Sequence, residues 1–189
     1  MSLVRKIVGT GILSAIVIAL TFFSNYISFG PVSITLALIP IVIGAVIYGP
    51  ITGLFLGLVN GAIVLLAPST GIFISHNLGI TIVLCLSKTG VAGLIAGLLP
   101  LLMKKHEKTA VITSSILVPI INTGIFILFC LGFFMDIFPE PTPSYLIMSV
   151  IGINFIIEFA VNAILSPTIF YIVNIVKERI FAMGNKNGL

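Results

Sequence analysis

Two ionisable residues, Lys88 and Glu158, lie inside long apolar stretches of this sequence. A charge in the middle of a lipid bilayer costs at least about 2.5 to 3.5 kcal/mol on insertion scales, so such residues face a protein interior and are candidates for function. Lys88 can face an anionic group, and Glu158 can accept hydrogen bonds from hydroxyl or amide groups of the same ligand. The alternative is a buried structural ion pair that joins the two segments, and the sequence leaves both interpretations open.

Amide side chains recur around these two charges. Asn154, Glu158 and Asn162 follow one another at four-residue spacing, which puts three polar groups on one face of a helix. Asn122 and Asn162 can equally form hydrogen bonds between helices. A histidine in a loop is more often solvated than a ligand. The remaining candidates for the same substrate-binding site are Asn122, Asn60 and the two loop residues His76 and Asn77.

No catalytic or metal-binding pattern accompanies these residues. The sequence has no H-E-x-x-H, no G-x-S-x-G and no phosphate-binding G-x-x-x-x-G-K-[ST] loop. Cys85 and Cys130 are isolated inside apolar stretches and resemble neither a metal site nor a disulfide framework. The sequence therefore argues against an enzyme, and we expect no catalytic residue, no metal and no cofactor in this chain.

The elements that must position these residues are membrane helices. Of the 189 residues, 59% are apolar and 7% are charged, which the surface of a water-soluble domain would not tolerate. No stretch is long enough for a separate soluble module, so we expect residues 1–189 to form a single integral-membrane domain. The formal net charge of +4 comes from basic residues that flank apolar stretches, which argues against nucleic-acid binding.

Hydropathy predicts an all-α membrane protein with six transmembrane helices. Each helix needs about 20 apolar residues to cross a hydrocarbon core of about 30 Å. The second and third apolar stretches are short and are separated only by Gly49 and Pro50, so we expect them to be tilted, broken or shielded by neighbours. The six helices are expected at residues 3–27, 32–48, 51–67, 79–103, 109–134 and 145–176.

The basic residues predict the orientation of these helices, because Lys and Arg resist translocation across the membrane. With six helices, all three basic clusters fall on one side, and the other side receives Asp136 and Glu140 but no Lys or Arg. We therefore expect both termini in the cytoplasm. The three clusters are Arg5 with Lys6, residues 104–108 and residues 177–186.

Small residues at four-residue spacing mark helix faces that can pack closely in lipid. In the first predicted helix, Gly11, Ala15 and Ala19 form such a stripe, and on an outward-facing surface it would let another membrane protein approach closely. The third and fourth helices carry further ladders, for which packing inside the bundle is the favoured interpretation. These ladders are Gly49, Gly53, Gly57 and Gly61 in the third helix and Gly93 with Gly97 in the fourth.

Three segments resemble one family of membrane proteins. They are Ile-Thr-Leu-Ala-Leu-Ile-Pro-Ile-Val-Ile-Gly at 34–44, the Gly49-Pro50 turn with its glycine ladder, and Gly-Val-Ala-Gly-Leu-Ile-Ala-Gly at 90–97. With the six-helix size, they resemble the S components, or substrate-binding subunits, of energy-coupling factor (ECF) transporters, which import vitamins through the cell membrane of prokaryotes. The stripe from Gly11 to Ala19 is similar to the A-x-x-x-A docking motif of this family, with Gly where the first Ala is usual.

The resemblance implies a division of labour between subunits. The S component captures its vitamin on the extracellular side and docks on a transmembrane coupling subunit, the T subunit. Two cytoplasmic ATPase subunits bind and hydrolyse ATP and so drive release inward. In this family the pocket opens outward and is closed by the loops between helices 1 and 2 and between helices 3 and 4, which here are residues 28–32 and 68–78.

The substrate expected from the resemblance is pantothenate. Residues 118–126 and 154–167 look most like S components assigned to this vitamin. Its carboxylate suits Lys88, and its amide and hydroxyl groups suit Glu158 and the asparagines. The absence of Trp argues against flat, stacked ligands such as flavin or pterin, although fourteen Phe are present. A pyridoxine or hydroxymethylpyrimidine-type ring stays open as an alternative substrate.

A stand-alone secondary transporter is the alternative function. Lys88 and Glu158 would then form an ion or proton relay inside the membrane. Such a protein is expected to carry an inverted repeat, which the two halves of this sequence do not display. Transport by the purified chain without ATPase partners would favour this alternative.

Overall fold

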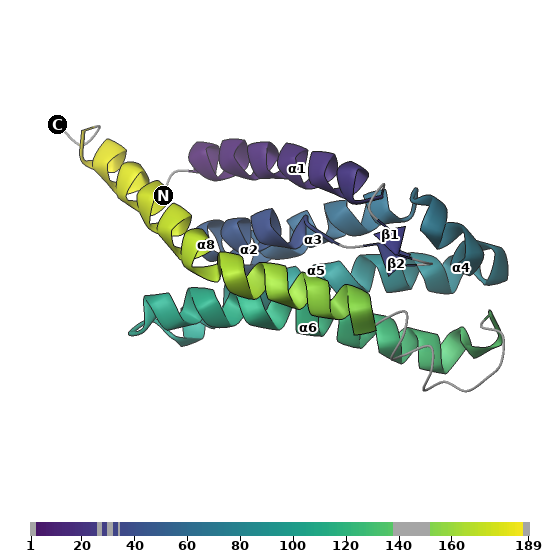
Figure 1. Cartoon of the computed structure of the whole chain (residues 1–189). Helices are drawn as coiled ribbons and strands as arrows, with labels where there is room; N and C mark the ends of the chain where they lie inside the picture. The colour runs from purple at the N-terminus through teal and green to yellow at the C-terminus, as the bar shows by residue number, and fades with distance from the viewer. Residues whose placement is uncertain (1–2, 26–27, 30–31, 34, 138–151, 187–189) are drawn as a thin grey trace.

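The computed structural model describes residues 3–25, 28–29, 32–33, 35–137 and 152–186, and nearly all of them are helical. The helices lie side by side in an elongated bundle, shown in Figure 1. One short antiparallel ladder, in which Ser28 pairs with Ser33, interrupts the helices. In chain order the elements are α1 (Leu3–Asn25), β1 (Ser28–Phe29), β2 (Val32–Ser33), α2 (Leu38–Tyr48), α3 (Pro50–Val64), η1 (Pro68–Thr70), α4 (Gly71–His76), α5 (Leu78–Leu102), α6 (Glu107–Phe133), η2 (Met135–Ile137) and α8 (Gly152–Lys186).

Four helices of the described chain, α1, α5, α6 and α8, are long and apolar enough to cross a membrane. A fifth span is obtained if α3 is counted together with η1 and α4, which bend away from it by 77°. The remaining helix, α2, has 11 residues and is about 17 Å long, roughly half the thickness of the hydrocarbon core. The chain is thus a multi-pass membrane protein, but six full-length spans are not confirmed.

The second predicted helix begins later than expected. Residues 32–33 belong to the ladder and not to a helix, and α2 begins at Leu38. Three of the four residues in Val-Ser-Ile-Thr at 32–35 are β-branched, which favours extended backbone. Pro40 lies in the first turn of α2, where its missing N–H breaks no hydrogen bond. Of the predicted helix at 32–48, residues 32–33 therefore form part of a strand and Leu38–Tyr48 form a short helix.

Helix α2 lies at the centre of the bundle, and this explains why it is apolar all round. It packs against α1, α3, α5, α6 and α8. Leu38, Ile41 and Val42 are fully buried, together with Val17 of α1 and Val173 of α8. Its hydropathy reflects burial inside protein and not contact with lipid.

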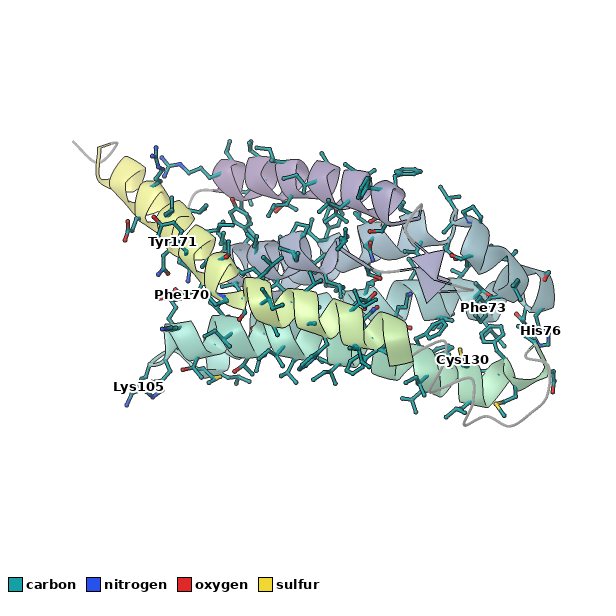
Figure 2. All side chains as sticks on the ribbon, in the orientation of Figure 1. Phe73, His76, Lys105, Cys130, Phe170 and Tyr171 are labelled. Atoms are coloured by element: carbon teal, nitrogen blue, oxygen red, sulfur yellow. The ribbon has the colours of Figure 1, made fainter. Side chains whose placement is uncertain are left out.

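The two ends of the bundle differ in charge. Helix α1 begins and α8 ends at the same end (Figure 1), and Lys105 in the turn between α5 and α6 lies at that end as well (Figure 2). His76 at the end of α4 lies at the opposite end (Figure 2). The predicted clustering of basic residues at one end is therefore consistent with the fold of the described chain.

A seam of small residues joins α3 to α5. A Cβ atom added to Gly53 would overlap the carbonyl oxygen of Gly93, and one added to Gly57 would overlap that of Thr89. The Thr89 hydroxyl donates a hydrogen bond to the Gly57 carbonyl oxygen at 2.7 Å. The prediction that these ladders pack inside the bundle is confirmed, because the two backbones touch where side chains would separate them.

Helix α1 has a buried face and an exposed face. Val17, Thr21 and Ser24 are buried against α2 and α3. Gly11, Ala15 and Ala19 are exposed, and a Cβ atom added to Gly11 would meet nothing within 4 Å. The small-residue stripe of the first helix therefore faces outward.

Candidate functional site

Glu158 is the centre of a buried polar cluster. It lies on α8, and only 4% of its surface is exposed. The backbone N–H of Thr35, just before α2, donates a hydrogen bond to Oε1 at 2.6 Å. The side-chain amide of Asn122 on α6 donates to Oε2 at 3.4 Å. Two neighbouring elements thus supply donors to one carboxylate inside the bundle.

The predicted polar face of α8 is present where the structure describes it. Asn162 lies one turn after Glu158, is 2% exposed, and donates its side-chain amide to the Glu158 carbonyl oxygen at 2.9 Å. One turn later Pro167 cannot donate to the Ala163 carbonyl oxygen, which accepts the Ser166 hydroxyl at 2.8 Å instead. Asn154 lies in α8, but its side chain falls outside the described residues.

Lys88 approaches this cluster from α5 without touching Glu158. Its ammonium group lies 5.4 Å from the centre of the Phe126 ring on α6, a cation–π contact. In the described part of the chain, Lys88 and Glu158 form no ion pair within 4.0 Å. A direct structural ion pair, one of the two interpretations open from the sequence, is therefore not observed.

Three buried amide atoms in the described residues have no hydrogen-bond partner. An unpaired polar group in a protein interior costs about 1 to 3 kcal/mol, so a ligand that supplies the missing partners gains this free energy on binding. Together with the half-buried Lys88, they provide both donors and acceptors for a polar molecule. The three atoms are Nδ2 of Asn60, Oδ1 of Asn122 and Oδ1 of Asn162.

Asn60 connects the interior to the first helix. It lies on α3 and is fully buried. Its Oδ1 atom accepts a hydrogen bond from the Thr21 hydroxyl of α1 at 2.7 Å. One end of this amide is therefore used between helices, and the other end is unpaired.

His76 and Asn77 do not join the Glu158 cluster. Asn77 is exposed, and its side chain accepts the Ile80 N–H at 3.0 Å as the N-cap of α5. His76 is exposed and lies 5.8 Å from the Phe134 ring. Figure 2 places His76 and Phe73 together at the end of the bundle away from Lys105. The predicted 68–78 loop is folded into η1 and α4 and carries these residues outside the cluster.

A chain of aromatic contacts separates that end from Lys88. The Phe73 ring of α4 packs edge-on against Phe126 at 5.7 Å and against Phe134 at 5.2 Å. Phe73 and Phe134 are buried. The polar cluster is therefore bordered on the α4 side by apolar rings, one of which also contacts the Lys88 ammonium group.

Sequence reasoning missed the donors that act through the backbone and the partners on α1. The Thr35 N–H has no signature in the sequence, because every residue except proline has one. Thr21 and Ser24 did leave a signal, since both are polar residues within an apolar helix and lie opposite its small-residue stripe. Phe126 could have been noticed one turn after Asn122 on the same helix.

The arrangement is suited to binding and not to bond chemistry. A buried carboxylate, unpaired amides and a cation can hold a molecule that has both hydrogen-bond donors and an anionic group. Within the described residues, no group of three His, Cys, Asp or Glu side chains could hold a metal ion.

Comparison with known protein families identifies the chain. A family model described as "ECF transporter, substrate-specific component" matches residues 5–170. The chain belongs to this family. Searches of curated proteins and of solved structures gave no significant match.

Membership in the ECF family confirms the coarse functional prediction. The chain is a substrate-binding subunit of an ECF transporter and not an enzyme. The family implies that it acts together with T and ATPase subunits. The alternative of a stand-alone secondary transporter is not favoured.

Proposed function

We propose that this S component captures pantothenate from the extracellular side and docks on its T subunit through the exposed stripe of α1. The observation that carries the proposal is the buried Glu158 cluster, in which the side-chain amide oxygens of Asn122 and Asn162 are unpaired. A small molecule that offers hydroxyl and amide donors at one end and a carboxylate at the other complements this set. Pantothenate has these groups.

Each group of the vitamin has a chemically matched partner in this scheme. Lys88 attracts the carboxylate and has no carboxylate partner within 4.0 Å among the described residues. Glu158, with lone pairs left after its bonds to Thr35 and Asn122, accepts from a hydroxyl group. The unpaired oxygens of Asn122 and Asn162 accept from the remaining hydroxyl or amide. Asn60 and Asn154 are proposed to contribute further amide contacts.

The proposed direction of capture follows from the charge at the two ends. The end with Lys105 also carries the beginning of α1 and the end of α8, so it faces the cytoplasm under the positive-inside rule (Figure 2). The opposite end, with β1, β2 and α4, then faces the outside, where the vitamin enters. His76 and Asn77 lie at this outer end and are proposed to meet the vitamin during entry, before it reaches Glu158.

Docking through α1 is supported by the exposure of its small residues. Gly11, Ala15 and Ala19 leave an open strip along the helix, and no other part of the described chain covers it. In lipid, such a strip lets a second helix approach to backbone contact. We expect ATP to be bound by the two ATPase subunits, with no cofactor in this chain.

Calorimetric titration of vitamins into the detergent-purified chain, without partner subunits, tests the proposal. Pantothenate is expected to bind one-to-one, and riboflavin, folate and pyridoxine are comparators. Binding of pyridoxine in place of pantothenate would replace the substrate and keep the capture role. Binding of none of the four would contradict the assignment of pantothenate.

A further inference from the structure

Two successive backbone amides hold two different helices. The Thr35 N–H donates to the Glu158 carboxylate of α8 at 2.6 Å. The next N–H, that of Leu36, donates to the Ser24 hydroxyl of α1 at 3.3 Å. The two Cα atoms of this dipeptide are only about 3.8 Å apart, as across any trans peptide bond. One short segment therefore touches both the polar cluster and the first helix.

The carbonyl groups of the same dipeptide are also engaged. The Thr35 oxygen accepts the Leu38 N–H at 3.4 Å, and the Leu36 oxygen accepts the Ile39 N–H at 3.3 Å. All four backbone polar groups of the dipeptide are thus paired, two with the start of α2 and one each with α1 and α8. The Thr35 bond is buried and the Leu36 bond is partly buried, so either N–H is costly to leave unpaired, and movement at one partner is transmitted to the other.

Ser24 lies on the buried face of α1. It is 2% exposed, and it is on the side of the helix opposite Gly11, Ala15 and Ala19. A helix that is pushed from its exposed stripe must move its buried face by the same amount. Ser24 is the point at which such a movement reaches the Leu36 N–H.

We infer that the Thr35–Leu36 dipeptide couples the Glu158 carboxylate to α1, and that Ser24 is a positioning residue for the binding site. The inference rests on the proposed function, in which Glu158 contacts the substrate and α1 docks. A displacement of α1 on docking draws Leu36 away and loosens the Thr35 N–H from Glu158, which weakens the hold on substrate. By linkage, an occupied site also favours one position of α1.

Amide hydrogen exchange of the full chain in detergent tests the coupling without any ligand. Ser24→Ala removes the acceptor of the Leu36 N–H, and we expect faster exchange by about fivefold at Leu36 and also at Thr35. Glu158→Met removes the other acceptor with similar bulk, and we expect faster exchange at both amides again. Ser14→Ala is the matched control, because the Ser14 hydroxyl bonds only the Thr10 carbonyl oxygen of its own helix at 2.8 Å.

Pantothenate affinity supplies a second readout that a merely structural serine would not move. Ser24→Ala is expected to weaken binding about fivefold with the melting temperature preserved. In the Glu158→Met background, Ser24→Ala is expected to have no further effect, because its action passes through Glu158. If the double variant loses affinity by the product of the two single-variant fold-changes, Ser24 acts independently of Glu158 and the positioning role is wrong.

The two readouts separate this inference from the proposed function. If Ser24→Ala speeds exchange at Leu36 alone and leaves Thr35 at the wild-type rate, the coupling is wrong even where pantothenate binds. If the wild-type chain does not bind pantothenate, the substrate assignment is wrong. The coupling is then decided by whether Ser24→Ala speeds hydrogen exchange at the Thr35 N–H.

Discussion

The glycine seam between α3 and α5 and the small-residue stripe of α1 follow the same four-residue spacing but have opposite surroundings. In the seam, a Cβ atom added to Gly53 or Gly57 would overlap the backbone of α5. On the stripe, a Cβ atom added to Gly11 would meet nothing within 4 Å. One pattern is closed by this chain itself, and the other is left open at the surface of the described protein.

This difference teaches that spacing alone identifies a face for close packing but not its partner. Helix α5 is the partner of α3, because its Gly93 lies against Gly53 and its Thr89 hydroxyl donates to the Gly57 carbonyl oxygen. No described element of this chain does the same for the stripe of α1, where Gly11, Ala15 and Ala19 are all exposed. An open strip in a subunit of a multi-subunit transporter is suited to contact with another subunit.

The largest effect is expected from closing space in the seam. Gly57→Leu puts a side chain against the Thr89 carbonyl group and Gly90, so α3 and α5 must separate. We expect loss of the folded monomer, measured by size-exclusion chromatography in detergent. Gly132→Leu is the matched control, since Gly132 is an exposed helical glycine with nothing within 4 Å. A well-folded Gly57→Leu protein would contradict the close contact.

The same bulk on the stripe is expected to spare the fold. Gly11→Leu or Ala15→Leu should block vitamin uptake in cells that contain the complete transporter, because the added side chain holds the T subunit away. Pantothenate binding by the purified variant should be unchanged, and Gly132→Leu should affect neither property. Normal uptake by both stripe variants would exclude the stripe as the docking surface.

A smaller effect is expected from a substitution in the proposed binding site, measured as a change in pantothenate affinity. Lys88→Ala removes the cation proposed to face the vitamin carboxylate, and we expect affinity to fall by about 10- to 100-fold, the range for a hydrogen bond to a charged group. Ser87→Ala is the neighbouring control, because the Ser87 hydroxyl bonds only the Leu84 carbonyl oxygen of its own helix at 3.2 Å. Unchanged affinity of Lys88→Ala would return Lys88 to a structural role.

The smallest effect is expected from the one side-chain hydrogen bond of the seam described above. Thr89→Val keeps the shape of the side chain and removes the donor to the Gly57 carbonyl oxygen. Hydrogen bonds between membrane helices contribute about 0.6 kcal/mol on average, so we expect a small fall in melting temperature. A loss of stability as large as that of Gly57→Leu would show that the hydrogen bond, and not backbone contact, holds the seam.

Long helices could be predicted well from the sequence, and the short central helix could not. The bounds of α5 and α6 agree with the predicted residues 79–103 and 109–134 within two residues at each end. Their ends are marked by polar residues, such as Lys104 after α5. The predicted helix at 32–48 begins too early, because hydropathy does not distinguish an apolar strand such as Val32–Ser33 from the start of a helix.

The prediction for α8 shows a related limit. The structure continues this helix to Lys186, ten residues beyond the predicted end at residue 176. Charged residues from Lys177 onward end the apolar stretch, but they are good helix formers and do not end the helix. Its predicted beginning, at residues 145–151, lies outside the described residues.

The polar cluster could be predicted in part from spacing. Glu158 and Asn162 share a helix face because four residues make about one turn, and Asn122 was expected to reach the same interior from another helix. The pairing of Asn60 with Thr21 and of Glu158 with the Thr35 backbone depends on tertiary packing, which the spacing of residues within one helix does not contain. The substrate roles of all these residues stay a prediction.

The most direct test of the account is a side-by-side calorimetric titration of pantothenate into the purified wild-type chain and its Ala15→Leu variant. The account predicts one-to-one binding with the same Kd in both proteins, because the binding site is buried inside the bundle and Ala15 is exposed on the outer face of α1. No binding by either protein, or clearly weaker binding by a well-folded Ala15→Leu variant, would contradict it.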